Sequence, residues 1–204
     1  RLAYVVFDTE TTGLDPERDE VVRIAGLRVV GGRLRPGESF ETLVDPGRPI
    51  PPTATEVHGV SDEMVAGAPR MEEAARLFHD FAAGAVLVAH NAPFDMAFLH
   101  RASGEAAVAF DAPTLDTVAL SAVVWGADAP HSLDALAERL DVLIAEEVRH
   151  TAMGDAEATA AAFVALLGIL DEMGIKTLGE ARAATRRQKR LIEEPAPAPQ
   201  AAAR

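Results

Sequence analysis

The sequence predicts an α/β fold in which a mixed sheet, antiparallel on one side and parallel on the other, is flanked by helices. Two observations support this prediction. Three strand-like segments follow one another before any helical pattern begins, as in an antiparallel meander. Further along, a short buried strand lies between two helical segments, which is the order of a parallel βαβ unit.

The first part of the chain supplies the meander. Residues 2–7 are apolar and partly β-branched, and the run ends at Asp8, as expected of a buried strand. A second strand is expected over residues 21–30. Gly31-Gly32 then provides a tight turn into a third strand, which ends near residues 40–44.

Helical periodicity dominates the rest of the chain. The proline-rich stretch 46–53 is expected to be a loop. A short buried strand is expected at 86–89. Helices are expected over residues 70–83, the segment after Pro93 that carries Phe94, and residues 115–125, 133–140, 152–173 and 178–192.

The chain of 204 residues is long enough for one domain with a substantial core. We expect a globular domain over 1–174, an appended basic helix over 175–192 and an Ala/Pro-rich tail or linker over 193–204. No signal peptide is recognisable, cysteine is absent and no apolar run of about 20 residues stands out, which together lead us to expect a cytoplasmic protein without a membrane partner.

Acidic residues outnumber basic ones, and the formal net charge is -13. Such a charge argues superficially against a nucleic-acid partner, because phosphate contacts require Lys and Arg. The objection is weaker for a site built from carboxylates, because bound divalent cations reverse the local field. Basic residues also gather near the carboxyl end, between Arg182 and Arg190.

Asp8 and Glu10 form the first candidate site. Residues i and i+2 of an extended segment point to the same side, so both carboxylates would face one point. Oxygen ligands without His or Cys suit Mg²⁺ or Mn²⁺, and Gly13 just beyond would let the backbone approach a ligand closely. The alternative is a chance D-x-E triplet with solvated side chains.

Asp95 and Asp155 each lie in the first turn of an expected helix. The helix dipole alone favours an acid there, so each has a structural explanation as well as a catalytic one. His150 lies on the loop that leads into the helix of Asp155. A loop histidine is commonly just solvated, but beside a cation site it can accept a proton from water.

Three motifs occur in order and in fitting contexts: DTETTG at the first strand, HNAPFD before the middle helix and HTAMGD before the last long helix. With these motifs the chain resembles the DEDD exonucleases, in their DEDDh (DnaQ-like) branch. The likeness is closest to the epsilon proofreading subunit of bacterial DNA polymerase III and covers residues 2 to about 174. It implies an RNase H-like fold with a mixed five-stranded sheet.

The resemblance also implies a mechanism. Asp8, Glu10 and Asp155 would hold one Mg²⁺ or Mn²⁺, Asp8 and Asp95 would hold a second, and His150 would deprotonate the attacking water. A 3′→5′ exonuclease of this kind releases nucleoside 5′-monophosphates from the 3′ end of single-stranded DNA. Proofreading or repair, in association with a DNA polymerase, is the expected setting.

Further positions match substrate contacts of the family. Thr9 and Thr11 lie where backbone and hydroxyl groups meet the scissile end, and His58 lies in a loop that touches the terminal nucleotide. Asn91 and Phe94 lie where relatives contact or stack on the substrate. The structural alternatives are a turn-capping His58, a helix-capping Asn91 and a core Phe94.

Two other functions remain open. An exoribonuclease like RNase T or oligoribonuclease would share the five catalytic residues, and the contacts that distinguish RNA from DNA through the 2′-OH are not visible in the sequence. A polymerase-associated binding module is the other, since residues 188–192 (QKRLI) faintly resemble motifs that dock on sliding clamps.

Overall fold

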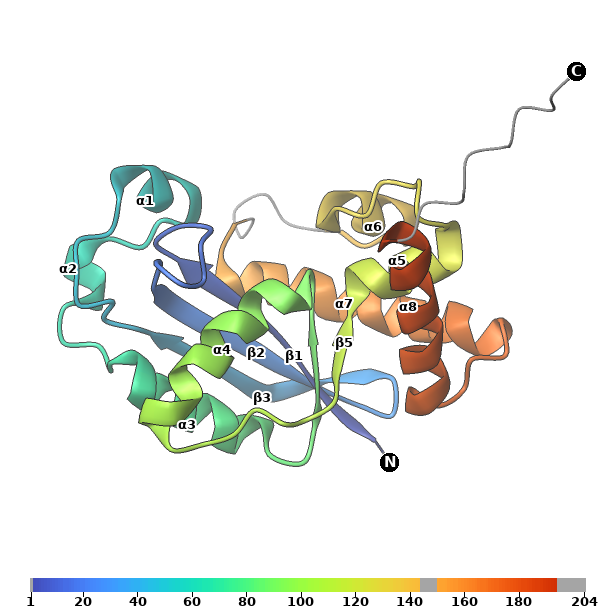
Figure 1. The fold of residues 1–204 in the computed structure, drawn as a ribbon, viewed down its shortest axis with the longest axis horizontal. Coiled ribbons are helices and arrows are strands. Elements are labelled where there is room, and N and C mark those ends of the chain that lie inside the picture. Colours follow the sequence, from blue (N-terminus) through green and yellow to red (C-terminus); the bar gives the residue numbers. More distant parts are fainter. Residues whose placement is uncertain (1, 144–149, 194–204) are drawn as a thin grey trace, which may run out of the picture.

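The computed structural model describes residues 2–143 and 150–193. A five-stranded sheet with the order β3-β2-β1-β4-β5 forms its centre (Figure 1). The strands are β1 (Ala3–Thr11), β2 (Val21–Val30), β3 (Arg33–Leu43), β4 (Val86–Ala89) and β5 (Thr114–Asp116). β1, β2 and β3 pair antiparallel, whereas β4 lies parallel to both β1 and β5. The predicted mixed sheet is confirmed.

β1 is longer than the sequence suggested, because it continues past Asp8 to Thr11. Glu10 pairs with Arg23 of β2, and the register shifts between Glu10 and Thr11. An irregularity of this kind bends a strand and re-aims its side chains. The two acids therefore lie within the paired part of β1, close to its carboxyl end.

The segment 115–125 was expected to be helical throughout, and this prediction is wrong at its start. Residues Thr114–Asp116 form β5, and the helix α5 (Thr117–Trp125) begins only after them. Asp116 is the N-cap of α5, with its side chain accepting a hydrogen bond from the Val118 backbone N–H. A strand of three residues is too short to show an alternation that sequence reasoning could detect.

The loop expected over residues 46–53 is also corrected, because helix α1 (Pro52–His58) already starts at Pro52. Proline suits the first position of a helix, where its missing N–H costs nothing. The remaining helices are α2 (Asp62–Val65), α3 (Met71–Ala82), α4 (Ala92–Ala106), α6 (Leu133–Arg139), α7 (Ala152–Glu172) and α8 (Leu178–Glu193).

The helices cover the two faces of the sheet. α3 and α4 pack on one face, where Phe7, Phe78 and Phe98 lie in one buried apolar cluster. α5, α6 and α7 pack on the other, around Val6 and Phe163. Neighbouring residues of β1, Val6 and Phe7, thus face opposite sides, as the pleat of a strand requires.

α7 has the length and composition of a helix that could cross a membrane, with a mean hydropathy of 1.5 over its best window. In this fold the helix packs along β1 and β2, and its alanines lie against the sheet. Ala156 and Ala160 are fully buried, and these small side chains let the helix approach the strands closely. Its apolar residues are therefore explained by the core that they build.

α8 follows the predicted globular domain and packs against α5, with Ala181 buried in the second core cluster (Figure 1). Residues 194–204, the predicted tail, lie outside the described part of the chain. The predicted boundary at residue 174 falls at Gly174, in the turn between α7 and α8.

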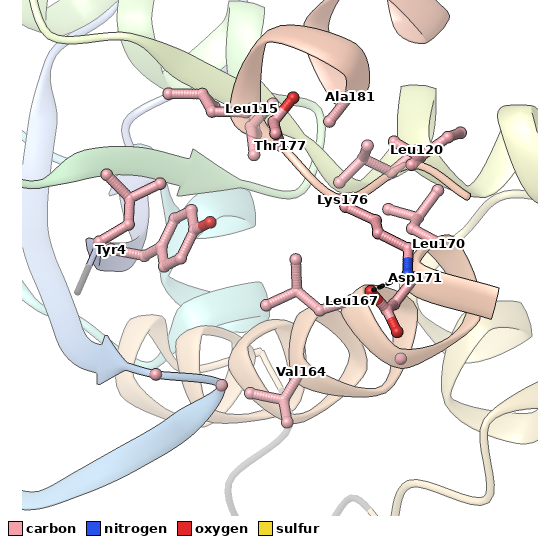
Figure 2. Close-up of a pocket in the computed structure, with 16 residues that line it drawn as sticks. Tyr4, Leu115, Leu120, Val164, Leu167, Leu170, Asp171, Lys176, Thr177 and Ala181 are labelled. Carbon is pink, nitrogen blue, oxygen red and sulfur yellow. Dashed lines mark ion pairs between the residues drawn. The ribbon is translucent and has the colours of Figure 1, made fainter. Parts of the chain in front are cut away.

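An open cavity of about 810 Å³ lies at the amino end of β1, lined by residues of β1, the β2–β3 turn, β5, α5, α7, α8 and the α7–α8 turn. Figure 2 shows Tyr4, Val164 and Leu167 around this amino-end cavity, with the exposed ion pair between Lys176 and Asp171 at its rim. Its walls are mostly aliphatic, so it offers few groups for chemistry.

Candidate active site

Three carboxylates meet at the carboxyl end of β1. Asp8 and Glu10 project to one side of the strand, and Asp155 reaches them from the first turn of α7. One oxygen of each side chain lies within 4.8 Å of one oxygen of each of the other two. The spacing of Asp8 and Glu10 predicted that these two carboxylates face one point, and the family resemblance implied that Asp155 joins them.

The crowding of these acids raises their pKa values. Burial raises the pKa of Asp8 well above its ordinary value, and the charges of Asp95, Glu10 and Asp155 add to the effect. Burial and then the charge of Asp155 raise the pKa of Glu10 to about 8, although Arg23 opposes the shift. Like charges held together out of water favour the protonated form or the arrival of a cation.

Asp95, from the first turn of α4, is only 3% exposed. Thr9 holds it in place: the backbone N–H donates to Asp95 Oδ1 at 3.1 Å and the hydroxyl donates to the same oxygen at 2.6 Å. Burial raises the pKa of Asp95 to about 7 even though the bonds from Thr9 favour the charged form. Asp95 is thus part of the same electrostatic cluster, fixed from β1.

The donor set fits a divalent cation. Glu10 Oε1 is buried and has no hydrogen-bond partner in the part of the chain that the structure describes. A buried oxygen without a partner is costly, and a hard cation with oxygen ligands would satisfy it while neutralising the neighbouring acids. Asp8, Glu10 and Asp155 are the residues placed to hold such an ion.

His150 lies just before Thr151, the N-cap of α7, and its side chain is exposed. Its φ of 58° is a left-handed conformation that few residues other than glycine adopt, so the loop makes a sharp turn at this residue. Among the described residues the metal-type cluster consists of Asp8, Glu10 and Asp155, and His150 is not part of it. Its role as the base stays a prediction.

The predicted contact residues on β1 are both buried. Thr9 uses its hydroxyl on Asp95, whereas Thr11 donates its hydroxyl to the Gly13 carbonyl at 2.6 Å. Thr11 also offers its own carbonyl to the His58 ring. These bonds give both threonines a clear part in holding the site, and their contact with substrate stays a prediction.

His58 is 5% exposed and both of its ring nitrogens have partners. Nδ1 accepts from the Val60 N–H at 3.1 Å, so Nε2 carries the proton and donates to the Thr11 carbonyl at 3.2 Å. Burial lowers the pKa of His58, which keeps the ring neutral. The geometry matches the turn-capping alternative and ties α1 to the end of β1.

Asn91 and Phe94 lie at the start of α4. The exposed Asn91 occupies the N-cap position with a φ of 62°, but its side chain makes no capping bond. Phe94 is partly buried and packs edge-to-face on Phe98, with ring centroids 5.2 Å apart. Capping therefore does not account for the Asn91 side chain, while Phe94 has packing contacts that do not depend on substrate.

Two residues that influence the pKa values of the acids were not predicted from the sequence to do so. Besides capping α5, Asp116 accepts from the Asn91 backbone N–H at 3.0 Å, and its charge adds to the rise that burial causes in the pKa of Asp95. Arg23 pairs across the strands with Glu10 and lowers its pKa. Both depend on strand register, which the sequence does not display.

Comparison with known proteins places the chain in a family. The family model named RNase T, described as an exonuclease, matches residues 5–163, and the chain belongs to this exonuclease family. The DNA polymerase III subunit epsilon-like protein of Rhodobacter capsulatus is 55% identical over 195 residues, which are 95% of this chain and 28% of that protein. The PolC-type DNA polymerase III of Caldanaerobacter subterraneus subsp. tengcongensis is 38% identical over 177 residues, 87% of this chain and 12% of that protein.

Solved structures agree with the fold. Exonuclease X, in complex with 5′ overhanging duplex DNA, superposes with a TM-score of 0.68 at 26% identity and covers 91% of this chain and 99% of its own. E. coli Exonuclease I, in complex with an oligonucleotide, superposes with a TM-score of 0.71 at 15% identity, covering 85% of this chain and 43% of its own. The predicted RNase H-like architecture is confirmed, and the chain spans only a minor part of the two polymerase relatives.

Proposed function

We propose that the chain is the catalytic domain of a metal-dependent 3′→5′ exonuclease that releases nucleoside 5′-monophosphates from DNA 3′ ends. The observation that carries this proposal is the convergence of Asp8, Glu10 and Asp155 beside the buried Asp95. Membership of an exonuclease family supports hydrolysis of a phosphodiester, and the polymerase relatives support a proofreading or repair setting.

Two divalent cations, Mg²⁺ or Mn²⁺, are the proposed cofactors. Asp8, Glu10 and Asp155 would hold one of them, and Asp8 with Asp95 would hold the other. When bound, such ions polarise the phosphate and stabilise the charge that develops on the attacking and leaving oxygens. The orphaned Glu10 oxygen and the raised pKa values of the acids support this assignment.

The protein groups supply the rest of the reaction. Thr9 orients Asp95 through two hydrogen bonds, so that its carboxylate is positioned before substrate arrives. His150, exposed on the loop before α7, would take the proton from the attacking water, since an imidazole accepts protons near neutral pH.

DNA is the proposed substrate because Exonuclease X, a relative over nearly its whole length, was solved with a DNA duplex carrying a 5′ overhang. The polymerase relatives suggest a DNA polymerase as partner, with the present chain as one module of a larger assembly. The clamp-like motif at 188–192 falls on residues whose side chains are mostly outside the described set.

The test is a time course on single-stranded DNA labelled at the 5′ end in one reaction and at the 3′ end in another, with Mg²⁺ present. A ladder that shortens from the 3′ end, with labelled mononucleotide released at once from the 3′ label, is expected. Internal cuts or release from the 5′ end would contradict the proposal. RNA of the same sequence is tested in parallel. If the RNA is hydrolysed faster than the DNA, the substrate assignment is reversed.

A further inference from the structure

The arginines near the candidate active site differ from those of α8 in their partners. Those around the candidate active site each face an acid: Arg23 faces Glu41, Arg48 faces Asp19 and Arg101 faces Glu20. On α8, by contrast, Arg182 and Arg186 are exposed, and neither has an ion pair within the described part of the chain. In a protein with a net charge of -13, this is positive charge left available for an external anion.

The two arginines are four residues apart, so they lie on the same face of α8. They line a pocket of about 200 Å³ between α8 and the carboxyl end of β5, together with Thr114, Asp116, Ala119 and Thr185. Guanidinium groups offer several fixed donors and match the oxygens of a phosphate. The pocket is therefore lined with donors suited to an oxyanion.

Asp116 is the acid in this pocket, and its hydrogen bonds are made to backbone groups of the sheet side and not to the two arginines. Its Oδ1 accepts from the backbone N–H groups of Asn91 and Val118, each at 3.0 Å. These bonds engage one carboxylate oxygen, Oδ1, from the side of the sheet. Among the described residues no ion pair joins Asp116 to Arg182 or Arg186, so the two arginines are available to a group arriving from solvent.

The pocket lies on the same edge of the sheet as the carboxylates. β4 separates β5 from β1, and all three strands run parallel. Adjacent strands are about 4.8 Å apart, so the end of β5 lies roughly 10 Å from the end of β1. A nucleic-acid strand advances about 3.4 Å per nucleotide in a duplex, which makes this distance a few nucleotides.

We propose that Arg182 and Arg186 of α8 bind phosphates of the substrate strand a few nucleotides away from the 3′ end held at Asp8, Glu10 and Asp155. This inference rests on the proposed function. α8 lies beyond residues 5–163, which the exonuclease family model matches, so the contact is an addition to the family's core. The alignment with the Rhodobacter capsulatus relative covers 95% of the chain and thus extends over this helix.

The experiment compares an Arg182→Ala/Arg186→Ala variant with an Arg35→Ala/Arg76→Ala control, which loses the same charge from exposed positions on β3 and α3. On an oligonucleotide of about a dozen nucleotides, the α8 variant should raise KM several-fold with kcat unchanged. Its plot of log KM against log salt should lose about 1.4 in slope, since each phosphate contact on a single strand contributes about 0.7. A dinucleotide, which cannot reach α8, should be hydrolysed as by the wild type.

Replacement of both arginines by Lys should restore most of the salt dependence, because the charge returns without the guanidinium geometry. An α8 variant that behaves like the control would overturn the inference. So would an equal loss on the dinucleotide, which would show that α8 only supports the fold.

Anisotropy of fluorescent DNA in excess chelator separates this inference from the proposed function. If the α8 variant binds DNA more weakly in chelator, and the wild type hydrolyses no DNA when Mg²⁺ is supplied, the proposed function fails and the phosphate surface stands. Binding unaffected by the variant would sink the surface alone, and acidic-protein recognition would then be the better explanation of α8.

Discussion

The two ends of β1 provide opposite environments. At the carboxyl end, Asp8 and Glu10 lie beside Asp155, and burial together with the charge of Asp155 raises the pKa of Glu10 to about 8. At the amino end, Tyr4 borders the amino-end cavity of about 810 Å³, whose walls are mostly aliphatic (Figure 2). The amino-end cavity therefore does not mark the site of chemistry, because its aliphatic walls create no electrostatic conflict that a ligand would resolve.

The difference teaches how to recognise function in this fold. The carboxyl end stores unfavourable energy, since several anions share a poorly hydrated place and one Glu10 oxygen has no partner. This arrangement does not stabilise the fold, whereas a bound cation would offset the repulsion between the acids and would give the Glu10 oxygen a partner. At the amino end, the only unfavourable contribution is the loss of packing contacts around the amino-end cavity.

The largest effect should come from removing one acid at the carboxyl end. Asp155→Asn and Glu10→Gln should each lower kcat at least about 100-fold, because bound cations supply several kcal/mol of transition-state stabilisation. In excess chelator, both variants should melt at or above the temperature of the wild type, since one repelling charge is gone.

Glu157→Gln is the matched control, since Glu157 is exposed on α7 two residues beyond Asp155. It should keep the activity of the wild type. Near-normal turnover in Asp155→Asn or Glu10→Gln would break the assignment of the carboxyl end as the site of chemistry.

A second effect concerns pH. In the absence of metal, the pKa of Glu10 is raised from 4.5 to about 8 in the folded protein, so the folded state binds more protons than the unfolded state between those values. Stability from this group is fully present below about 4.5 and is lost as pH rises through about 8. Burial lowers the pKa values of His58 and of the partly buried His90, so these histidines act in the opposite sense, and only below their ordinary pKa of 6.5.

Melting temperatures in chelator should therefore fall between pH values of about 6.5 and 8.5, and Glu10→Gln should flatten that fall. Mg²⁺ or Mn²⁺ should raise the melting temperature, and the gain should grow with pH, because cations bind the deprotonated acids. Thermal melts across this range, with and without metal, measure both. A wild-type curve that rises with pH in chelator, or a Glu10→Gln curve of equal slope, would refute the protonation of this site.

Much of the carboxyl end could be predicted from sequence because its signals are local. The place of Asp155 beside the other acids was implied by the family resemblance of the motifs. The i, i+2 spacing of Asp8 and Glu10, by contrast, sets their common direction directly. Such rules depend on a few neighbouring residues. They do not require knowledge of which strand pairs with which.

The features that sequence reasoning missed all depend on contacts between distant segments. β5 has three residues and exists because β4 pairs with it. Arg23 reaches Glu10 only through the β1–β2 register, and Asp116 reaches Asn91 across two strand ends. Pro52 was placed in a loop because prolines suggest loops, although the first position of a helix accepts proline equally well.

The smallest effect should come from the amino end, through Gly168. This residue lies within α7 and borders the amino-end cavity, and a Cβ added to it would meet nothing within 4 Å. Alanine is favoured over glycine inside a helix by up to about 1 kcal/mol, so Gly168→Ala should raise the melting temperature by about 2–4 °C.

Activity should not change in Gly168→Ala, because the substitution lies at the far end of the strand from the acids. Gly26→Ala is the contrasting variant: its Cβ would lie 3.3 Å from Phe78 Cε2 in the core, so it should lower the melting temperature. Thermal melts and turnover of the two variants test the separation of the ends. A Gly168→Ala protein that is more stable but slower on DNA would show that the cavity and the carboxylates are coupled through α7, whose first turn carries Asp155.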